Sequence, residues 1–477
     1  MNIHVVKLAL VLPLLLTSYL FANLVHVPIN HNVYFFLERM SIKSYLPDYL
    51  NSTLPLNRPY IKRMLNEIDK HRAELSLIEV NMLDEYLNNF SDSDHNSNYY
   101  LLKNNENIYS AISSFDNIRI GLSNIFTYKK NQPDDHLIVY EKNNQKIWFD
   151  IGSIARYESV KNNNRLIYSY RYSLAYIFKN QFCIYSDADL YAMVHNQDFD
   201  TPPLEFKGGY PQVHEGFYGY EKETSFEYAN SYIEYLSNVG RISLNVEPIR
   251  WGLGLNPIIL SDNVAPLPMI SWTKKINRSQ FSFFHGNIKP NIADSNYIYG
   301  SITDSNELIK SEKKYLVGHR WELGLSNKFQ IAFTEMLVYG GRDPELFYFF
   351  PTIFLWPVQH NMSSQSEDNI LWFFEGEYLI RNGYKAYGTF MLDELNTKRM
   401  FKDWIGNRWV YQLGINISKT IIKVPVDLQI EFTAARPWAY THRVPVYGTY
   451  THYGRSLGFI YGPNSQLLSI ENRWWFS

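Results

Sequence analysis

The sequence lacks the features that mark several large protein classes. Its 477 residues include a single cysteine, Cys183, so no disulfide can form within the chain. After Phe21 no apolar run is long enough to cross a membrane as a helix, and the mean hydropathy is negative. A net charge of −2 gives no reason to expect a nucleic-acid partner. These absences argue against a disulfide-stapled domain, a helical membrane protein and a nucleic-acid-binding protein.

Common catalytic motifs are missing as well. The 13 histidines include no H-E-x-x-H pair, and no G-x-S-x-G elbow, P-loop or dinucleotide fingerprint is found. Asp187 and Asp189 lie two residues apart and share one strand face. Two such carboxylates could hydrolyse a sugar bond, but a charged lumen wall is the commoner reason for the pattern. We therefore expect no enzyme activity, no cofactor and no bound metal.

Alternation of apolar and polar residues is what the chain has in abundance from Tyr99 onward. In segment 166–178 every second residue is leucine or aromatic, and segment 427–433 alternates in the same way. Successive side chains of a strand lie on opposite faces, so each segment has one apolar and one polar surface. Tyrosine numbers 38, which suits strand ends at a membrane interface. We predict an all-β transmembrane barrel of about 18 antiparallel strands over residues 99–477.

A soluble β-propeller or a β-sandwich is the alternative architecture. Either would bury its apolar face in a core rich in valine, isoleucine and leucine, whereas the apolar face here is rich in tyrosine. No repeat of about 40–50 residues is visible either. The pattern therefore favours the membrane barrel.

Residues 1–98 do not show this strand alternation. Residues 1–22 place Lys7 before an apolar run and end at Ala22, which is typical of a secretory signal peptide, with an uncleaved anchor as the alternative. Residues 23–98 predict a module of three amphipathic helices and a polar linker. Asn57 is the expected cap of the second helix, and Ser76 with Glu79 has capping-box spacing at the third. This module is one candidate to fill the barrel lumen.

Two clusters carry residues of interest for binding. Arg250 and Trp251 open a Gly- and Pro-rich stretch that includes Asp262 and Asn263, where the chain leaves the sheet. We favour a constriction held by Arg–Asp pairing over a loop that contacts a polymer. A second cluster follows a clear strand and is composed of Arg436, Trp438 and Tyr440. Flat apolar rings beside forked donors suit a glycan, although aromatic residues at strand ends also anchor barrels in the membrane.

Glu335 breaks the alternation of its strand. It falls among Ile331, Phe333 and Leu337 on the apolar side. The sequence leaves its partner open, with Arg342 and His319 as candidates.

The stretch 251–268 resembles the hallmark segment of the Wzi family of capsule assembly proteins. Further similar segments follow in the expected order along most of the chain: 27–37, 56–60, 317–320, 333–342, 388–394 and 450–458. The resemblance implies an outer-membrane barrel with a helical module near the periplasmic mouth. It also implies a lectin-like role, in which the protein holds exported capsular polysaccharide on the cell surface.

Function is therefore predicted as non-enzymatic attachment of capsular or other surface polysaccharide. We expect a monomer in the bacterial outer membrane, in contact with its lipid. A selective porin for sugars or anions is the first alternative, and an outer-membrane hydrolase is the second.

Overall fold

The computed structural model describes residues 25–90, 138–142, 144–160, 163–195, 214–215, 223–262, 264–290, 313–362, 368–394 and 407–476. The expected signal peptide, the linker and Asn263 lie outside these residues.

Three helices open the described chain, as predicted. They are α1 (Val33–Ile42), α2 (Arg58–Asp69) and α3 (Leu77–Asn89), with the short turn η1 (Arg72–Glu74) between the last two. The side chain of Asn57 accepts a hydrogen bond from the Tyr60 amide, and Ser76 forms the expected capping box with Glu79. Their apolar faces meet in one buried cluster that includes Phe36, Leu65 and Leu83. The helix starts are therefore set by local hydrogen bonds that the sequence encodes.

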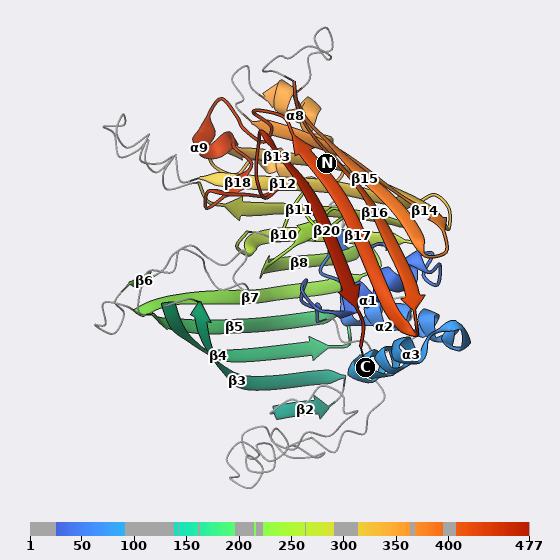
Figure 1. The fold of residues 1–477 in the computed structure, drawn as a ribbon. Helices are drawn as coiled ribbons and strands as arrows, with labels where there is room; N and C mark the ends of the chain where they lie inside the picture. The colour runs from blue at the N-terminus through green and yellow to red at the C-terminus, as the bar shows by residue number, and fades with distance from the viewer. Residues whose placement is uncertain are drawn as a thin grey trace, which may run out of the picture.

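A large antiparallel sheet of 16 strands makes up most of the rest. Along its path, each strand pairs with the next in the order β2 (Ile138–Lys142), β3 (Gln145–Val160), β4 (Asn163–Phe178), β5 (Phe182–His195), β7 (Glu223–Ser237), β8 (Gly240–Glu247), β10 (Leu267–Ile276), β11 (Ser279–Ile288), β12 (Lys314–Gly324), β13 (Phe329–Gly340), β14 (Asn369–Arg381), β15 (Tyr384–Glu394), β16 (Arg408–Ile421), β17 (Val424–Ala435) and β20 (Ser465–Trp474). The sixteenth strand, β6 (His214–Glu215), pairs with β7. The sheet curves strongly around the helices (Figure 1). Closure and a count of about 18 strands stay predictions.

Small elements complete the fold. They are the two-stranded pairs β1 (Thr53–Leu54) with β9 (Arg250–Trp251) and β18 (Thr451–His452) with β19 (Arg455–Ser456), the short turn η3 (Leu346–Phe349), and the helices α8 (Leu355–Met362) and α9 (Pro445–Gly448).

The two faces of the sheet differ as the alternation predicts. On β4, Leu166, Tyr170 and Tyr172 are exposed, whereas Ile167 and Ser169 between them are buried. On β20 the apolar Leu468 and Ile470 are more than half exposed, at 62% and 64%. Large apolar side chains therefore cover the convex, outer face, and the polar residues point inward.

The two ends of the sheet also differ. At one end, tight turns join neighbouring strands, such as residues 422–423 between β16 and β17. At the other end the connections are long, including 341–368 and 436–464. Helices α1–α3 lie at the short-turn end, and α8 and α9 lie at the long-loop end (Figure 1). Helix α1 is joined to this first end because the Gly383 amide donates to the Ile42 carbonyl at 2.8 Å.

Candidate functional site

The connection between β8 and β10, residues 248–266, lies against the inner face of the sheet, and we call its first part, residues 248–262, the inner loop. Trp251, Ile258 and Leu260 are buried against inward-facing residues of the sheet such as Phe284 and Phe373. Trp251 and Leu260 exchange main-chain hydrogen bonds of 2.9 and 3.0 Å, which folds the loop into a hairpin. The sequence prediction that the chain leaves the sheet here is confirmed, and it turns inward.

The inner loop is fastened to the N-terminal module. Strand β9 pairs with β1, with Trp251 opposite Thr53. The Gly252 amide adds a hydrogen bond of 2.8 Å to the Ser52 carbonyl. Module and loop therefore form one continuous plug.

Two carboxylates on the inner wall hold the loop in place. Glu375 accepts from the Leu253 amide at 2.9 Å, and Glu431 accepts from the Leu255 amide at 2.7 Å and the Asn256 amide at 3.0 Å. Gly254 has φ +85°, and a Cβ there would lie 2.0 Å from a Glu431 oxygen. A side chain at position 254 would therefore push the loop off its carboxylate.

The opposite end of the inner loop meets the connection between β17 and β20. The hydroxyl of Tyr440 donates to the Ile258 carbonyl at 2.8 Å, and that of Tyr450 donates to the Ile259 carbonyl at 2.7 Å. The two rings stack at 5.7 Å. Burial raises the pKa of the Tyr440 hydroxyl, so it stays protonated and keeps donating.

Buried charges fasten the helices to the wall at the short-turn end. Arg39, only 1% exposed, pairs with Glu79 of α3 and with Asp427 of β17, and also donates to the carbonyls of Lys419 and Val426. Burial alone would raise the pKa of Glu79, but Lys43, Arg39 and the Ser76 amide outweigh it and lower that pKa. Arg39 and Glu79 are therefore buried between the helices and β17 and do not face solvent.

A second group of polar contacts joins the segment before α2 to β12. Arg320 donates to the hydroxyls of Ser52 and Thr53 at 2.6 and 3.0 Å, and both hydroxyls donate to Glu322 at 2.6 and 2.8 Å. Arg320 also pairs with Glu375, the residue that holds the inner loop. Ser52, Arg320, Glu322 and Glu375 are buried and Thr53 is half-buried, so the network is rigid only while all its members are present.

His26 makes the third such contact. Its Nδ1 lies 2.7 Å from Glu247 and its Nε2 lies 2.9 Å from Glu234, while Arg241 is 2.9 Å from the same Nε2. Burial alone would lower the pKa of His26, but the two carboxylates outweigh it and raise the pKa to about 9. At neutral pH the imidazolium therefore ties the first described residues to β7 and β8.

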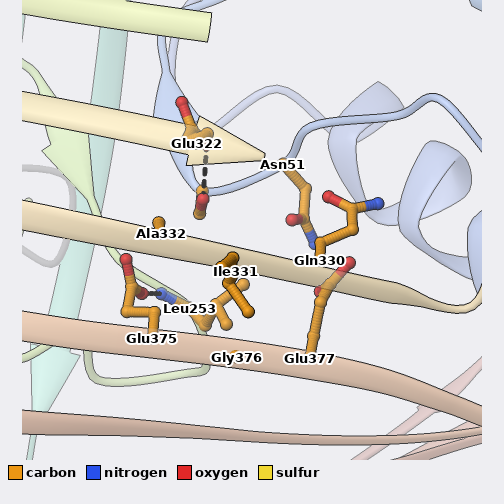
Figure 2. A pocket seen from close by; sticks show the side chains of 10 residues that line it. Asn51, Leu253, Glu322, Gln330, Ile331, Ala332, Glu375, Gly376 and Glu377 are labelled. Atoms are coloured by element: carbon orange, nitrogen blue, oxygen red, sulfur yellow. Dashed lines mark hydrogen bonds between the residues drawn. The ribbon is translucent and has the colours of Figure 1, made fainter. Parts of the chain in front are cut away.

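A small hollow lies where module, inner loop and wall meet (Figure 2). Asn51, Leu253, Glu322, Gln330 and Glu377 are among its lining residues. The space in it that the centre of a water molecule can reach is about 10 Å³, which is close to what a single water molecule needs. A sugar ring does not fit, so this part of the interior offers no carbohydrate site.

The second predicted cluster is divided by the fold. Trp438 is 53% exposed and sits at the tip of a turn with φ +70°. Arg436 lies over the Trp409 ring at 5.4 Å, whereas Tyr440 is buried, at 2% exposure. The sequence did not point to Asp393 as a partner of this cluster. Its carboxylate accepts from the Tyr440 amide at 2.9 Å and so fixes this turn. Trp438 and Arg436 are therefore near the surface at the long-loop end, and Tyr440 has a structural position.

The residues of the first predicted cluster are placed as follows. Trp251 is buried in the plug, and Arg250 donates to the Gly254 carbonyl. Asp262 is exposed, so the expected pairing of Arg250 with Asp262 is not what holds this loop. The loop is held by the wall carboxylates and tyrosines instead.

Within the described residues, no group of three or more histidine, cysteine, aspartate or glutamate side chains is arranged to hold a metal ion. In the same part of the chain, no helix is both long and apolar enough to span a membrane.

Comparison with known proteins places the fold. No family profile and no characterised sequence matches the chain. Among solved structures, it is similar to Wzi, an Escherichia coli outer-membrane protein that is described as a carbohydrate-binding β-barrel involved in group 1 capsule assembly. The match covers 94% of this chain and 81% of that one, with a TM-score of 0.51 and 13% identity. The likeness is one of fold.

A homologue of FadL from Pseudomonas aeruginosa also matches, at 8% identity over 65% of this chain and 72% of that one. Its TM-score of 0.23 is too low to carry an argument. The fold, a large curved antiparallel sheet with an N-terminal helical module, is therefore similar to that of Wzi.

Proposed function

We propose that this protein is a non-enzymatic outer-membrane β-barrel that binds capsular or other surface polysaccharide during capsule assembly. The observation that carries the proposal is the plug: helices, inner loop and tyrosines are linked by buried hydrogen bonds from the short-turn end to the long-loop end. Such a filled interior does not suit a porin, and it moves ligand contacts to the long-loop end. The fold of a carbohydrate-binding barrel supports the same function.

The long-loop end carries groups that suit a glycan. Trp438 offers an exposed aromatic face, and a guanidinium lies nearby at Arg436, over Trp409. Sugars present C–H surfaces that pack on such rings and hydroxyls that accept from guanidinium groups. We propose Trp438 and Arg436 as contacts, and Tyr440 as the support beneath them.

The test is Trp438→Ala, scored for polysaccharide that stays with the cells against polysaccharide released into the medium. Because the ring is half exposed, we expect retention to fall while the barrel folds normally, as judged by heat-modifiable gel mobility. Tyr440→Phe is the matched control: it removes the hydroxyl bond to Ile258 but leaves Trp438 in place. Unchanged retention by a folded Trp438→Ala protein would reject this residue as a contact. Loss of stability without loss of retention per folded molecule would make Trp438 a membrane anchor.

A further inference from the structure

The connection between β13 and β14 does not extend outward from the sheet. Residues 341–362, which we call the outer strap, contain η3 and α8 and fold back over the outer face. Tyr348 and Leu355 of the strap are buried against Phe283, Val317 and Leu337 of the sheet. These three sheet residues alternate with inward-facing Phe284, Leu316 and Met336, so they lie on the outer face.

Glu335 fastens the strap. Its carboxylate accepts from the Leu355 amide at 2.8 Å and the Trp356 amide at 3.2 Å, which are the first amides of α8. The Trp372 indole donates to the same carboxylate at 3.1 Å. Of the two partners that the sequence suggested, His319 lies 3.9 Å from the Glu335 carboxylate, whereas Arg342 pairs with Asp368 instead. The break in alternation is therefore explained by a helix end on the outer face.

Several strap positions have either no amide donor or a donor that is bonded within the protein. The next residue of α8 is Pro357, which has no N–H, and Pro351 removes another donor in the middle of the strap. The Glu345 amide donates to the Tyr339 hydroxyl at 3.1 Å. A backbone whose donors are removed or satisfied internally is what an apolar medium demands, because unpaired groups are costly there.

The outward side of the strap is apolar from residue 346 to residue 359. Residues 346–359 contain no charged side chain. Five of their large apolar side chains have exposed fractions between 47% and 72%: Leu346, Phe347, Phe350, Phe354 and Trp356. This surface continues the apolar outer face of the neighbouring strands, where Trp321 and Phe374 are exposed.

We propose that the outer strap is a lipid-contact element, whose exposed side chains pack against acyl chains of the outer leaflet. The proposal rests on the proposed membrane location, and it goes beyond it by assigning a loop segment to the bilayer. Three observations support it together: the position on the outer face, the apolar surface of residues 346–359, and the strap amides that proline removes or that are bonded within the protein. Glu335 is then a positioning residue that holds α8 flat on the sheet.

The test labels cysteines that are introduced at the surface. The single native cysteine, Cys183, is fully buried and so does not compete for the label. Phe350→Cys and Phe354→Cys are labelled with an environment-sensitive fluorophore and reconstituted in phosphatidylcholine vesicles. Quenching is measured with doxyl-labelled phosphatidylcholine and with aqueous iodide. Ile470→Cys on β20 is the lipid-facing reference, and Leu77→Cys on α3, at 78% exposure, is the aqueous reference.

We expect both strap labels to lose as much fluorescence to the doxyl lipid as Ile470→Cys and to be protected from iodide. Quenching by iodide, as for Leu77→Cys, would overturn the proposal and place the strap in water. Quenching by neither would also overturn it, because a protein surface would then cover the strap. If the Ile470→Cys label itself escapes the doxyl lipid, the proposed membrane location fails, and the strap proposal falls with it.

Discussion

The plug is held by different chemistry at its two ends. At the short-turn end, buried charges join the helices to the wall, with Arg39, Glu79 and Asp427 as the clearest set. At the long-loop end, tyrosine hydroxyls donate to main-chain carbonyls within an apolar cluster. A buried ion left without its partner costs far more than a lost neutral hydrogen bond. The short-turn end should therefore be the more sensitive to single substitutions and to pH.

The largest effect is expected at the short-turn end. Arg39→Ala leaves Glu79 and Asp427 without this partner and should lower the free energy of unfolding by about 3–5 kcal/mol. The matched control is Arg72→Ala, whose pairs with Asp69 and Asp84 are exposed and should cost less than about 1 kcal/mol. Denaturant titration of the refolded proteins measures both. Equal losses would remove the distinction between the buried and exposed charges.

A pH effect should follow from His26. Its pKa is higher in the folded protein, about 9 against 6.5, so the folded state binds the proton more tightly. Its contribution to stability is therefore complete below pH 6.5 and is lost as the pH rises through 9. The shift corresponds to at most about 3 kcal/mol.

The measurement is unfolding free energy from pH 6 to 10. His26→Gln should flatten this part of the profile, whereas His71→Gln, an exposed residue, should leave it unchanged. A profile that falls equally steeply in His26→Gln would assign the effect to other groups.

The smallest of these effects concerns the inner loop between the two ends. Gly254→Ala forces a side chain into positive φ and against Glu431, and we expect a loss of about 1–3 kcal/mol. Gly152→Ala is the control, since a Cβ there meets nothing within 4 Å, and it should stay within about 0.5 kcal/mol. Thermal unfolding compares the two. If Gly254→Ala is as stable as the control, the loop is not held as tightly as its contacts indicate.

Local rules were enough to predict much of the fold. The helix starts at Asn57 and Ser76 and the alternation on β4 depend on neighbours within a few residues, and all three are confirmed. The departure of the chain from the sheet at Arg250 was predictable from glycine and proline, but its inward direction was not.

The partners of buried polar groups could not be predicted in the same way. Arg39 has the spacing of a solvent-facing helix residue, yet its partner Asp427 is 388 residues away. In the sequence Tyr440 looks like part of an exposed aromatic cluster, but in the fold it is buried and its hydroxyl donates to the Ile258 carbonyl. Glu335 gave a local signal, a break in alternation, but the helix that explains it begins 20 residues later. Such long-range pairings depend on the assembled sheet and its inner loop and leave no periodic pattern in the chain.

Conductance across planar bilayers tests the central claim, a filled barrel interior, most directly. The refolded protein is added to the bilayer and the current is recorded at fixed voltage. Because module, inner loop and tyrosines form one continuous plug, the account predicts no steady, large pore current. Steady large currents from the intact protein would contradict the filled interior and favour a sugar or anion porin.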